Sequence, residues 1–250
     1  MRVLVGIVVG LYLLTGCVTT TTSGLPPPED AEKRLEAHLG LARGYLSGRD
    51  FERARETLDR ALEIDPKSVE AYVLKAVISE NEQDQDLAEE YYDKALRFDP
   101  NHSQALNNYA SFLYGQQRYP EALPPLRRLV RDVGYHARAQ AYENLGLAEL
   151  KAGDRELAKD AFSRALRLDY SQVSSSLELV DITYVDGDYQ IASEYYEGFR
   201  SRSRQNARSL CLGMKIGEAL HDADRLASYT LALQNLFPNS PEAAQCLATR

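Results

Sequence analysis

The feature that most constrains this chain is a pattern of small and large apolar residues that returns about every 34 residues. The small residues are Ala54, Ala88, Ala122, Ala158, Ala192 and Ala227, and the larger ones, each four positions later, are Leu58, Tyr92, Leu126, Phe162, Tyr196 and Leu231. Residues four apart lie on one face of a helix, and this period is typical of stacked two-helix units. Because one such unit cannot bury its apolar face alone, we expect a solenoid of stacked copies.

The clearest copy begins at Tyr142 and has the spacing of a helix hairpin. The small residues Gly146 and Ala158 let two antiparallel helices approach closely, while larger side chains such as Phe162 fill the space between them. Gly153 closes the first helix, where a left-handed cap is less costly for a residue without Cβ. This arrangement resembles the tetratricopeptide repeat, and the resemblance implies an all-α fold wound as a right-handed superhelix.

Six repeats and a final capping helix account for most of the chain after residue 30. The repeats span about 35–68, 69–102, 103–138, 139–172, 173–207 and 208–239, and the capping helix spans about 241–248. We therefore expect one domain over 31–250, an all-α tetratricopeptide solenoid of six helix hairpins plus a C-terminal capping helix. The third repeat carries Pro124 and Pro125 inside its second helix. Because an interior proline costs about 3 kcal/mol, we expect that helix to begin near Pro124.

Two repeats also depart from the regular length. The third carries about two extra residues around 133–137, and the sixth carries about one.

Residues 1–16 are interpreted as a targeting segment and not as part of the fold. Arg2 precedes an apolar run over 3–14 that is too short to span a bilayer of about 30 Å as a helix. Leu-Thr-Gly then precedes Cys17, a spacing that resembles the bacterial lipobox and implies that Cys17 becomes the acylated first mature residue. The alternative is an ordinary signal peptide with an incidental Cys17. Val18, where an aspartate would resemble an inner-membrane retention signal, favours the outer membrane.

The segment 17–30 combines the lipidated cysteine with a flexible tether rich in threonine and proline. Several acyl chains anchor a protein stably where one chain is marginal. Thirteen extended residues, 18 to 30, span at most about 40–45 Å. We therefore expect the solenoid to stand away from a membrane to which its N-terminus is anchored.

The net charge of −8 over 250 residues argues against a nucleic-acid partner, because binding phosphates needs a basic face. The densest basic stretches are Arg127-Arg128 with Arg131 and the segment 200–208, which we interpret as solvated helix faces and a loop. The chain lacks the motifs of serine hydrolases, zinc proteases, phosphate loops and dinucleotide sites, and its acidic pairs lack the spacing of a calcium loop. We expect no enzyme activity, no cofactor, no metal site and no small-molecule substrate.

The expected binding surface is a concave groove, which in tetratricopeptide proteins is lined by alternate turns of each first helix. Carried over position by position, the groove residues are Leu39, Arg43, Leu46, Val73, Val77, Glu80, Asn107, Ser111, Tyr114, Glu143, Leu147 and Leu150. Leucine and valine are unusual at solvent-facing positions, and an exposed apolar patch often marks a partner site. We expect the partner to bind the N-terminal half, around Leu39 and Val73. The alternative is that neighbouring helices cover these side chains.

Beyond the generic repeat, the chain resembles the PilF/PilW family of type IV pilus biogenesis lipoproteins. The resemblance rests on Asn107–Tyr114, on Tyr142–Gly146, on Tyr195-Tyr196 with Phe199, and most specifically on Gln205–Gly213. It implies a pilotin: an outer-membrane lipoprotein, anchored through Cys17 on the periplasmic face, that binds PilQ-type secretin subunits and promotes their outer-membrane localisation and multimerisation. The alternative is another tetratricopeptide lipoprotein serving β-barrel assembly or peptidoglycan synthesis, which the motif Gln205–Gly213 argues against.

Cys211 and Cys246 are the free thiols that remain if Cys17 is acylated. They lie about one repeat apart, at similar positions of successive first helices, and an oxidising compartment favours a disulfide. Packed helix axes lie about 8–10 Å apart, whereas a disulfide needs Cα atoms within about 7 Å, so only cysteines that face each other can bond. The alternative is two small buried residues, and the sequence leaves both possibilities open.

Overall fold

The structure, a computed structural model, describes residues 28–248, and in that range it contains thirteen α-helices and no strand. The helices are α1 (Pro28–Ser47), α2 (Phe51–Ile64), α3 (Val69–Asn81), α4 (Gln85–Phe98), α5 (Ser103–Gly115), α6 (Tyr119–Leu129), α7 (Arg138–Ala152), α8 (Arg155–Leu168), α9 (Val173–Val185), α10 (Tyr189–Arg200), α11 (Ala207–Ala219), α12 (Ala223–Leu236) and α13 (Pro241–Ala248). Helix α1 begins two residues before residue 30, the expected end of the tether. Proline is favoured at the first position of a helix, where no N–H is needed. The signal segment, Cys17 and most of the tether lie outside the described residues.

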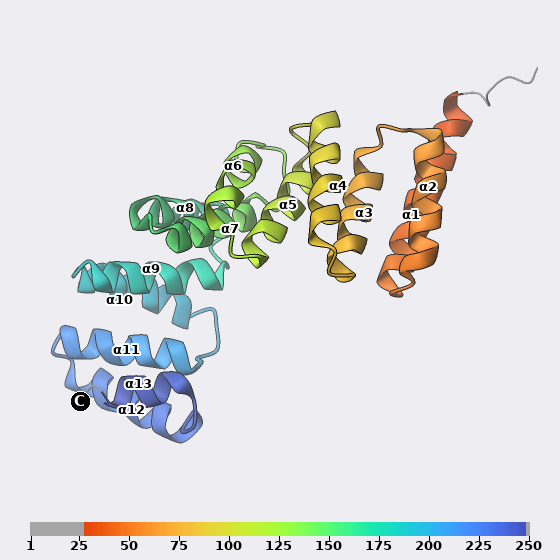
Figure 1. The fold of residues 1–250 in the computed structure, drawn as a ribbon. Coiled ribbons are helices and arrows are strands. Elements are labelled where there is room, and N and C mark those ends of the chain that lie inside the picture. Colours follow the sequence, from red (N-terminus) through yellow and green to blue (C-terminus); the bar gives the residue numbers. More distant parts are fainter. Residues whose placement is uncertain (1–27, 249–250) are drawn as a thin grey trace, which may run out of the picture.

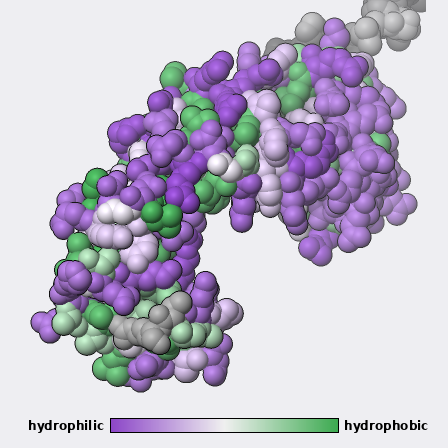
Figure 2. Space-filling view, turned by 60° about the vertical axis from the view of Figure 1, so that its left-hand side comes forward, coloured by the Kyte–Doolittle hydropathy of each residue, from purple (hydrophilic) through white to green (hydrophobic). Residues whose placement is uncertain are grey.

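Six antiparallel hairpins stack into a curved solenoid (Figure 1). Each odd-numbered helix from α1 to α11 pairs with the helix that follows it, and α13 packs on α11 and α12. At four of the five junctions the first helices of neighbouring hairpins also touch, as α1 does with α3 and α7 does with α9, so they line the inside of the curve. Figure 2 shows the hollow that this curvature leaves between the two ends of the molecule. The expected all-α solenoid of six hairpins plus a capping helix is confirmed.

The N-cap of each second helix determines which of its residues enter the core. These caps are Asp50, Asp84, Arg118, Asp154, Asp188 and Asp222. In four of them the aspartate side chain accepts a hydrogen bond from the backbone N–H three residues later, which satisfies a free donor of the first turn. In the first five hairpins the predicted small and large residues follow the cap by four and eight positions, and all ten are at most 2% exposed.

The sixth hairpin differs, and the positions predicted there are wrong by one residue. Ala227 is exposed and Leu231 is 59% exposed, whereas Leu226 and Leu233 turn inward. The caps Asp188 and Asp222 are one regular period apart, so this repeat contains no inserted residue. A cap sets the rotation of the helix that follows it, whatever the size of the residue at the expected position.

The residue before each of these caps has a left-handed backbone conformation and lies in the turn that reverses the chain direction. The six residues are Arg49, Gln83, Gln117, Gly153, Gly187 and His221, with φ between 58° and 95°. Gly153 has the left-handed φ expected of it, yet four of the six turns use a residue with a side chain. Such a residue carries a conformational cost of order 1 kcal/mol or more, which the packing of the hairpin must offset.

The second helix of the third hairpin begins at Tyr119, so the prediction that it starts near Pro124 is wrong. Its first turn is already formed when the prolines are reached, because the N–H of Ala122 donates to the carbonyl of Arg118. Pro124 and Pro125 then lie inside the helix, where their fixed φ of about −65° fits helical backbone. The burial of Ala122 and its neighbours in the core holds this turn helical despite the two missing N–H donors.

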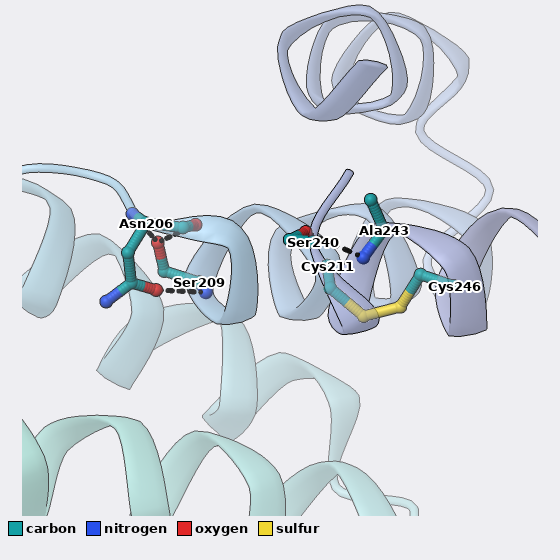
Figure 3. The surroundings of a disulfide bond; sticks show 6 residues. All are labelled: Asn206, Ser209, Cys211, Ser240, Ala243 and Cys246. Carbon is teal, nitrogen blue, oxygen red and sulfur yellow. Dashed lines mark hydrogen bonds between the residues drawn. A yellow bond between two sulfur atoms is a disulfide. The ribbon is translucent and has the colours of Figure 1, made fainter. Parts of the chain in front are cut away.

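A disulfide joins the capping helix α13 to α11 at the C-terminal end (Figure 3). Cys211 and Cys246 are bonded, and their Cα atoms lie 6.0 Å apart. Both residues are also buried in the last hydrophobic cluster of the solenoid. Ser240 precedes α13, and its Oγ accepts a hydrogen bond from the N–H of Ala243 at 3.1 Å. The capping helix is therefore held by a covalent bond, a capping hydrogen bond and apolar packing.

We predict that replacing Cys246 with serine lowers the free energy of unfolding by about 3–4 kcal/mol. The disulfide spans a sequence separation of 35 residues, and closing a loop of that length reduces the entropy of the unfolded chain by about this much. Urea unfolding followed by circular dichroism measures the loss, and Cys211→Ser, which breaks the same bond, should match it. Thiol titration of the unfolded, unreduced wild type should find neither cysteine reactive. Two reactive thiols would contradict the bond.

Candidate functional site

The structure separates the predicted groove residues into a buried group and an accessible group. Leu39 and Val73 are only 4% and 3% exposed and belong to hydrophobic clusters between helices. Leu46 packs against the same cluster as Leu39. The prediction that these side chains form an open apolar patch in the N-terminal half is therefore wrong. Stacking covers them, because each hairpin lies against the next and buries positions that a single hairpin would expose.

The N-terminal half of the groove is bridged by ion pairs. Arg43 of α1 lies 2.7 Å from Glu36 and 2.6 Å from Glu70 of α3, so it connects the first two hairpins. Half-exposed pairs of this kind contribute at most about 1 kcal/mol each, because water screens them. Val77 is half-buried in α3. This part of the groove offers ion pairs to a partner in place of the apolar side chains that were expected.

Two acidic residues expected in the groove also serve the fold. Glu80 accepts a hydrogen bond from the hydroxyl of the buried Tyr92. Glu143 is 7% exposed, and its Oε2 accepts from both the N–H and the hydroxyl of Ser175 at 2.8 Å. Ser175 lies in the first turn of α9, whose own N-cap, Gln172, makes no capping side-chain bond. Glu143 of one hairpin therefore caps the first helix of the next.

The accessible residues of the prediction meet at a small apolar pocket on the concave side. Its volume is about 110 Å³, and its lining residues are Ala110, Ser111, Tyr114, Leu126, Asn144 and Leu147. Ser111, Tyr114 and Leu147 come from the predicted set, whereas Asn107 and Leu150 are half-buried beside the lining. Leu126, predicted as a core residue, closes the pocket floor. The sequence therefore indicated three of the six lining residues, but the predicted centre of binding, around Leu39 and Val73, lies two hairpins too early.

The pocket exists because the third and fourth hairpins stack irregularly. The connection between α6 and α7, residues 130–137, is longer than the corresponding connection 65–68 or 99–102. The extra residues predicted around 133–137 lie in it. Of the two helices of the preceding hairpin, α7 packs on α6 and makes no extensive contact with α5, unlike α3 with α5 or α7 with α9. The inner helices α5 and α7 are therefore parted, and the gap between them reaches down to Leu126 of α6.

The rim of the pocket offers polar groups to a partner. Gln140 donates to the Oδ1 of Asn144 at 3.2 Å, so the amide nitrogen of Asn144 stays available as a donor. The Tyr114 ring packs edge-on against the Tyr119 ring, with 5.1 Å between the ring centres. No residue in 28–248 forms a hydrogen bond with the Tyr114 hydroxyl. Partial burial raises the pKa of Tyr114, so the hydroxyl remains neutral near pH 7. An apolar floor with neutral donors at its rim suits one side chain and the adjoining backbone of a peptide.

The size of the pocket limits what it can hold. Sites for small molecules and cofactors usually occupy about 300–1,000 Å³, whereas this pocket has about 110 Å³. Among the described residues no group of His, Cys, Asp and Glu is arranged to hold a metal ion. The pocket therefore has room for a single apolar side chain of a protein partner.

The motif Gln205–Gly213 forms the junction before the last hairpin and does not line the groove. The Oε1 of Gln205 accepts from the hydroxyls of Tyr196 and Ser209, both at 2.9 Å. Asn206 and Ser209 form a reciprocal capping box at the start of α11 (Figure 3). A Cβ on Gly213 would collide with the ring of Tyr196. This motif, the most specific one in the sequence, therefore has a structural role.

Comparison with protein families identifies the repeat. The family model described as Tetratricopeptide repeat matches residues 39–103 and 143–207, and a second model of the same description matches residues 91–123. Together these matches cover residues 39–123 and 143–207, which is more than half of the chain.

Comparison with individual proteins finds relatives over almost the whole length. The Type IV pilus assembly protein PilF of Pseudomonas aeruginosa is 40% identical over 230 residues, which cover 92% of this chain and 91% of that protein. A solved structure from a functional characterisation of Pseudomonas aeruginosa pilF has 39% identity and a TM-score of 0.76, covering 88% of this chain and 100% of its own. The crystal structure of PilW, a widely conserved type IV pilus biogenesis factor, has 29% identity and a TM-score of 0.67, with coverages of 85% and 98%.

Proposed function

This chain belongs to the tetratricopeptide-repeat proteins of type IV pilus biogenesis, and on this premise we propose that it is the pilotin of a PilQ-type secretin. The observation that carries the proposal is the 40% identity to PilF over 92% of the chain. Identity of that extent to a pilus assembly protein favours this function over a scaffold for β-barrel assembly or peptidoglycan synthesis. As a non-enzymatic scaffold, the protein would bind secretin subunits and promote their multimerisation at the outer membrane.

The second part of the proposal is a lipid anchor at Cys17. The support is the apolar run that ends in Leu-Thr-Gly before this cysteine, which itself lies outside the described residues. In the part of the chain that the structure describes, no helix is both long and apolar enough to cross a bilayer. Acyl chains on Cys17 would hold the solenoid at the periplasmic face of the outer membrane, on a tether that reaches α1.

The third part is that the pocket between α5 and α7 receives an apolar side chain of the secretin segment. The pocket is the accessible apolar recess on the concave side, and Tyr114 and Asn144 present neutral hydrogen-bonding groups at its rim. The buried Leu39 and Val73 cannot take that role without separating two hairpins. We therefore place secretin binding at the third and fourth hairpins and not at the first two.

We predict that Ser111→Arg weakens secretin binding by about 30-fold or more and abolishes multimeric secretin in the outer-membrane fraction. A residue that anchors an interface typically carries at least about 2 kcal/mol of the binding energy. Ser111 is exposed at the rim of the pocket, so an arginine there can fill the recess without entering the core. Secretin multimers are measured by immunoblot of outer-membrane fractions, and affinity by titrating purified secretin subunits against the lipoprotein.

Ser47→Arg is the matched control for this experiment. Like Ser111, Ser47 is an exposed serine of a first helix whose hydroxyl donates to a carbonyl of its own helix. The control should assemble secretin normally. If Ser111→Arg folds, as circular dichroism would show, and still supports full secretin assembly, the proposed use of the pocket is wrong.

A further inference from the structure

Six arginines form one continuous surface on the outer side of the third and fourth hairpins. They come from α6, the connection after it, the start of α7, and α8, and we call them the arginine surface: Arg127, Arg128, Arg131, Arg138, Arg164 and Arg167. Three adjoining hollows of about 270, 390 and 190 Å³ connect them. Arg131 lines the first and second hollows, and Arg164 lines the first and third. The stretch Arg127-Arg128 with Arg131, interpreted from the sequence as a solvated face, is thus half of a larger cluster.

Most of these arginines lack an acidic partner. Arg127 pairs with Glu149 and Arg164 with Asp160, each at 2.7 Å. The other four have no carboxylate within ion-pair distance among residues 28–248. Asp132 also lines the second hollow, and the positive charge of Arg138 is one of the causes that lower its pKa. Three carboxylates, Glu149, Asp160 and Asp132, therefore face six guanidinium groups, and the excess of like charges is repulsive. The arginine surface is therefore a positive patch on an acidic protein.

Several of the guanidinium groups are held in place. The guanidinium carbons of Arg138 and Arg164 lie 5.6 and 5.9 Å from the centre of the Tyr142 ring, so one tyrosine positions both. Arg138 also donates to the carbonyl of Val130 at 2.8 Å, and Arg128 to the carbonyl of Pro100 at 2.9 Å. Contacts to a ring and to neutral carbonyls orient these cations without cancelling their charge. Because these arginine side chains are already ordered, binding a partner would cost little of their conformational entropy.

Exposed leucines lie beside the cations. Leu157 lines the hollow that holds Arg127 and Arg164, and it is 45% exposed. Leu168 lines the hollow that holds Arg138 and Arg167, and it is 50% exposed. A ligand that fits this surface must therefore combine carboxylates or phosphates with apolar groups at short spacing.

We propose that the arginine surface binds an acidic segment of a protein partner, with glutamate or aspartate side chains on the guanidinium groups and apolar side chains against Leu157 and Leu168. Planar guanidinium groups match carboxylates through paired hydrogen bonds. The hollows between the helix ridges fit a protruding chain better than the flat plane of lipid headgroups. Four of its six arginines lie on the second helices α6 and α8, whereas the groove pocket lies between the first helices α5 and α7, so this site goes beyond the binding of the secretin segment in the groove.

The test measures the affinity of the full-length protein, in non-ionic detergent, for a fluorescent peptide of alternating glutamate and leucine. We expect the wild type to bind this peptide, and Arg131→Glu with Arg167→Glu to bind it at least about tenfold more weakly, as for close charge pairs across an interface. Arg60→Glu with Arg97→Glu is the matched control. It makes the same change in net charge at two exposed arginines of α2 and α4, so it should bind within about twofold of the wild type.

Four results would overturn the proposal. The first is that the wild type does not bind the acidic peptide. The second is that the control variant loses as much affinity as Arg131→Glu with Arg167→Glu, which would show that only the overall charge matters. The third is equal binding of a peptide with glutamine in place of glutamate. The fourth is binding of phosphatidylglycerol vesicles, lost in Arg131→Glu with Arg167→Glu, while the acidic peptide neither binds nor competes; this would assign the surface to the membrane. Preferential binding of the acidic peptide that falls with added salt supports the proposal.

Discussion

Replacing Gly146 with alanine should destabilise the protein by about 3 kcal/mol, although alanine is the better helix former. A Cβ at this position of α7 would lie 2.6 to 2.9 Å from three ring carbons of Phe162 in α8, closer than carbon atoms pack. Phe162 is completely buried, so its ring cannot move aside without disturbing the core. Forcing extra volume into a packed core costs typically about 1–3 kcal/mol and occasionally more. Urea unfolding followed by circular dichroism measures the change.

The same substitution at Gly40 should have the opposite effect and raise the free energy of unfolding. A Cβ on Gly40 of α1 meets no atom within 4 Å, so only the preference of the helix for alanine remains, and we expect a gain of about 0.5–1 kcal/mol. The two variants differ only in where the methyl group is added. If Gly146→Ala were as stable as Gly40→Ala, the close approach of α7 and α8 would not be what requires the glycine.

Cys17→Ser should release the protein from the outer membrane and remove secretin multimers from it. In our proposal the acyl chains on this cysteine supply the membrane affinity, at about 0.8 kcal/mol for each buried CH₂, and serine cannot accept them. The solenoid should fold as before, because α1 begins eleven residues after Cys17 and every described core residue lies further on. Sedimentation of envelope fractions, with immunoblots for this protein and for the secretin, gives the distribution.

Thr19→Ser is the control for this variant, because it changes the tether and leaves the cysteine in place. It should sediment with the outer membrane as the wild type does. If Cys17→Ser also sedimented there, the anchor would lie elsewhere in the chain. If the released protein still supported secretin multimers in the outer membrane, anchoring would be separate from assembly, and the carrier role in our proposal would be wrong.

Two placements in the sequence analysis failed for the same physical reason. Leu39 and Val73 were assigned to the groove from their positions on single hairpins, and the stacked neighbour buries them. Ala227 was assigned to the core from its small side chain, and the cap at Asp222 rotates the helix so that Leu226 turns inward. In both cases exposure depends on how one element is oriented against the next, which residue type and spacing do not specify. The cap aspartates themselves were a readable signal, one period apart before most second helices.

The repeating unit and its core can be read from the sequence alone. Small residues four positions before larger ones, as at Ala158 and Phe162, require two helices that approach closely, and the period requires each hairpin to be covered by the next. These are local requirements of packing and hydrogen bonding, so they can be read along the chain. The position at which the solenoid opens, by contrast, became visible only in the folded protein. The pocket above Leu126 arises because a longer connection parts α5 from α7, and the arginine surface arises where α6, α7 and α8 line a common hollow. Such a junction depends on the relative placement of whole hairpins, which no single repeat encodes.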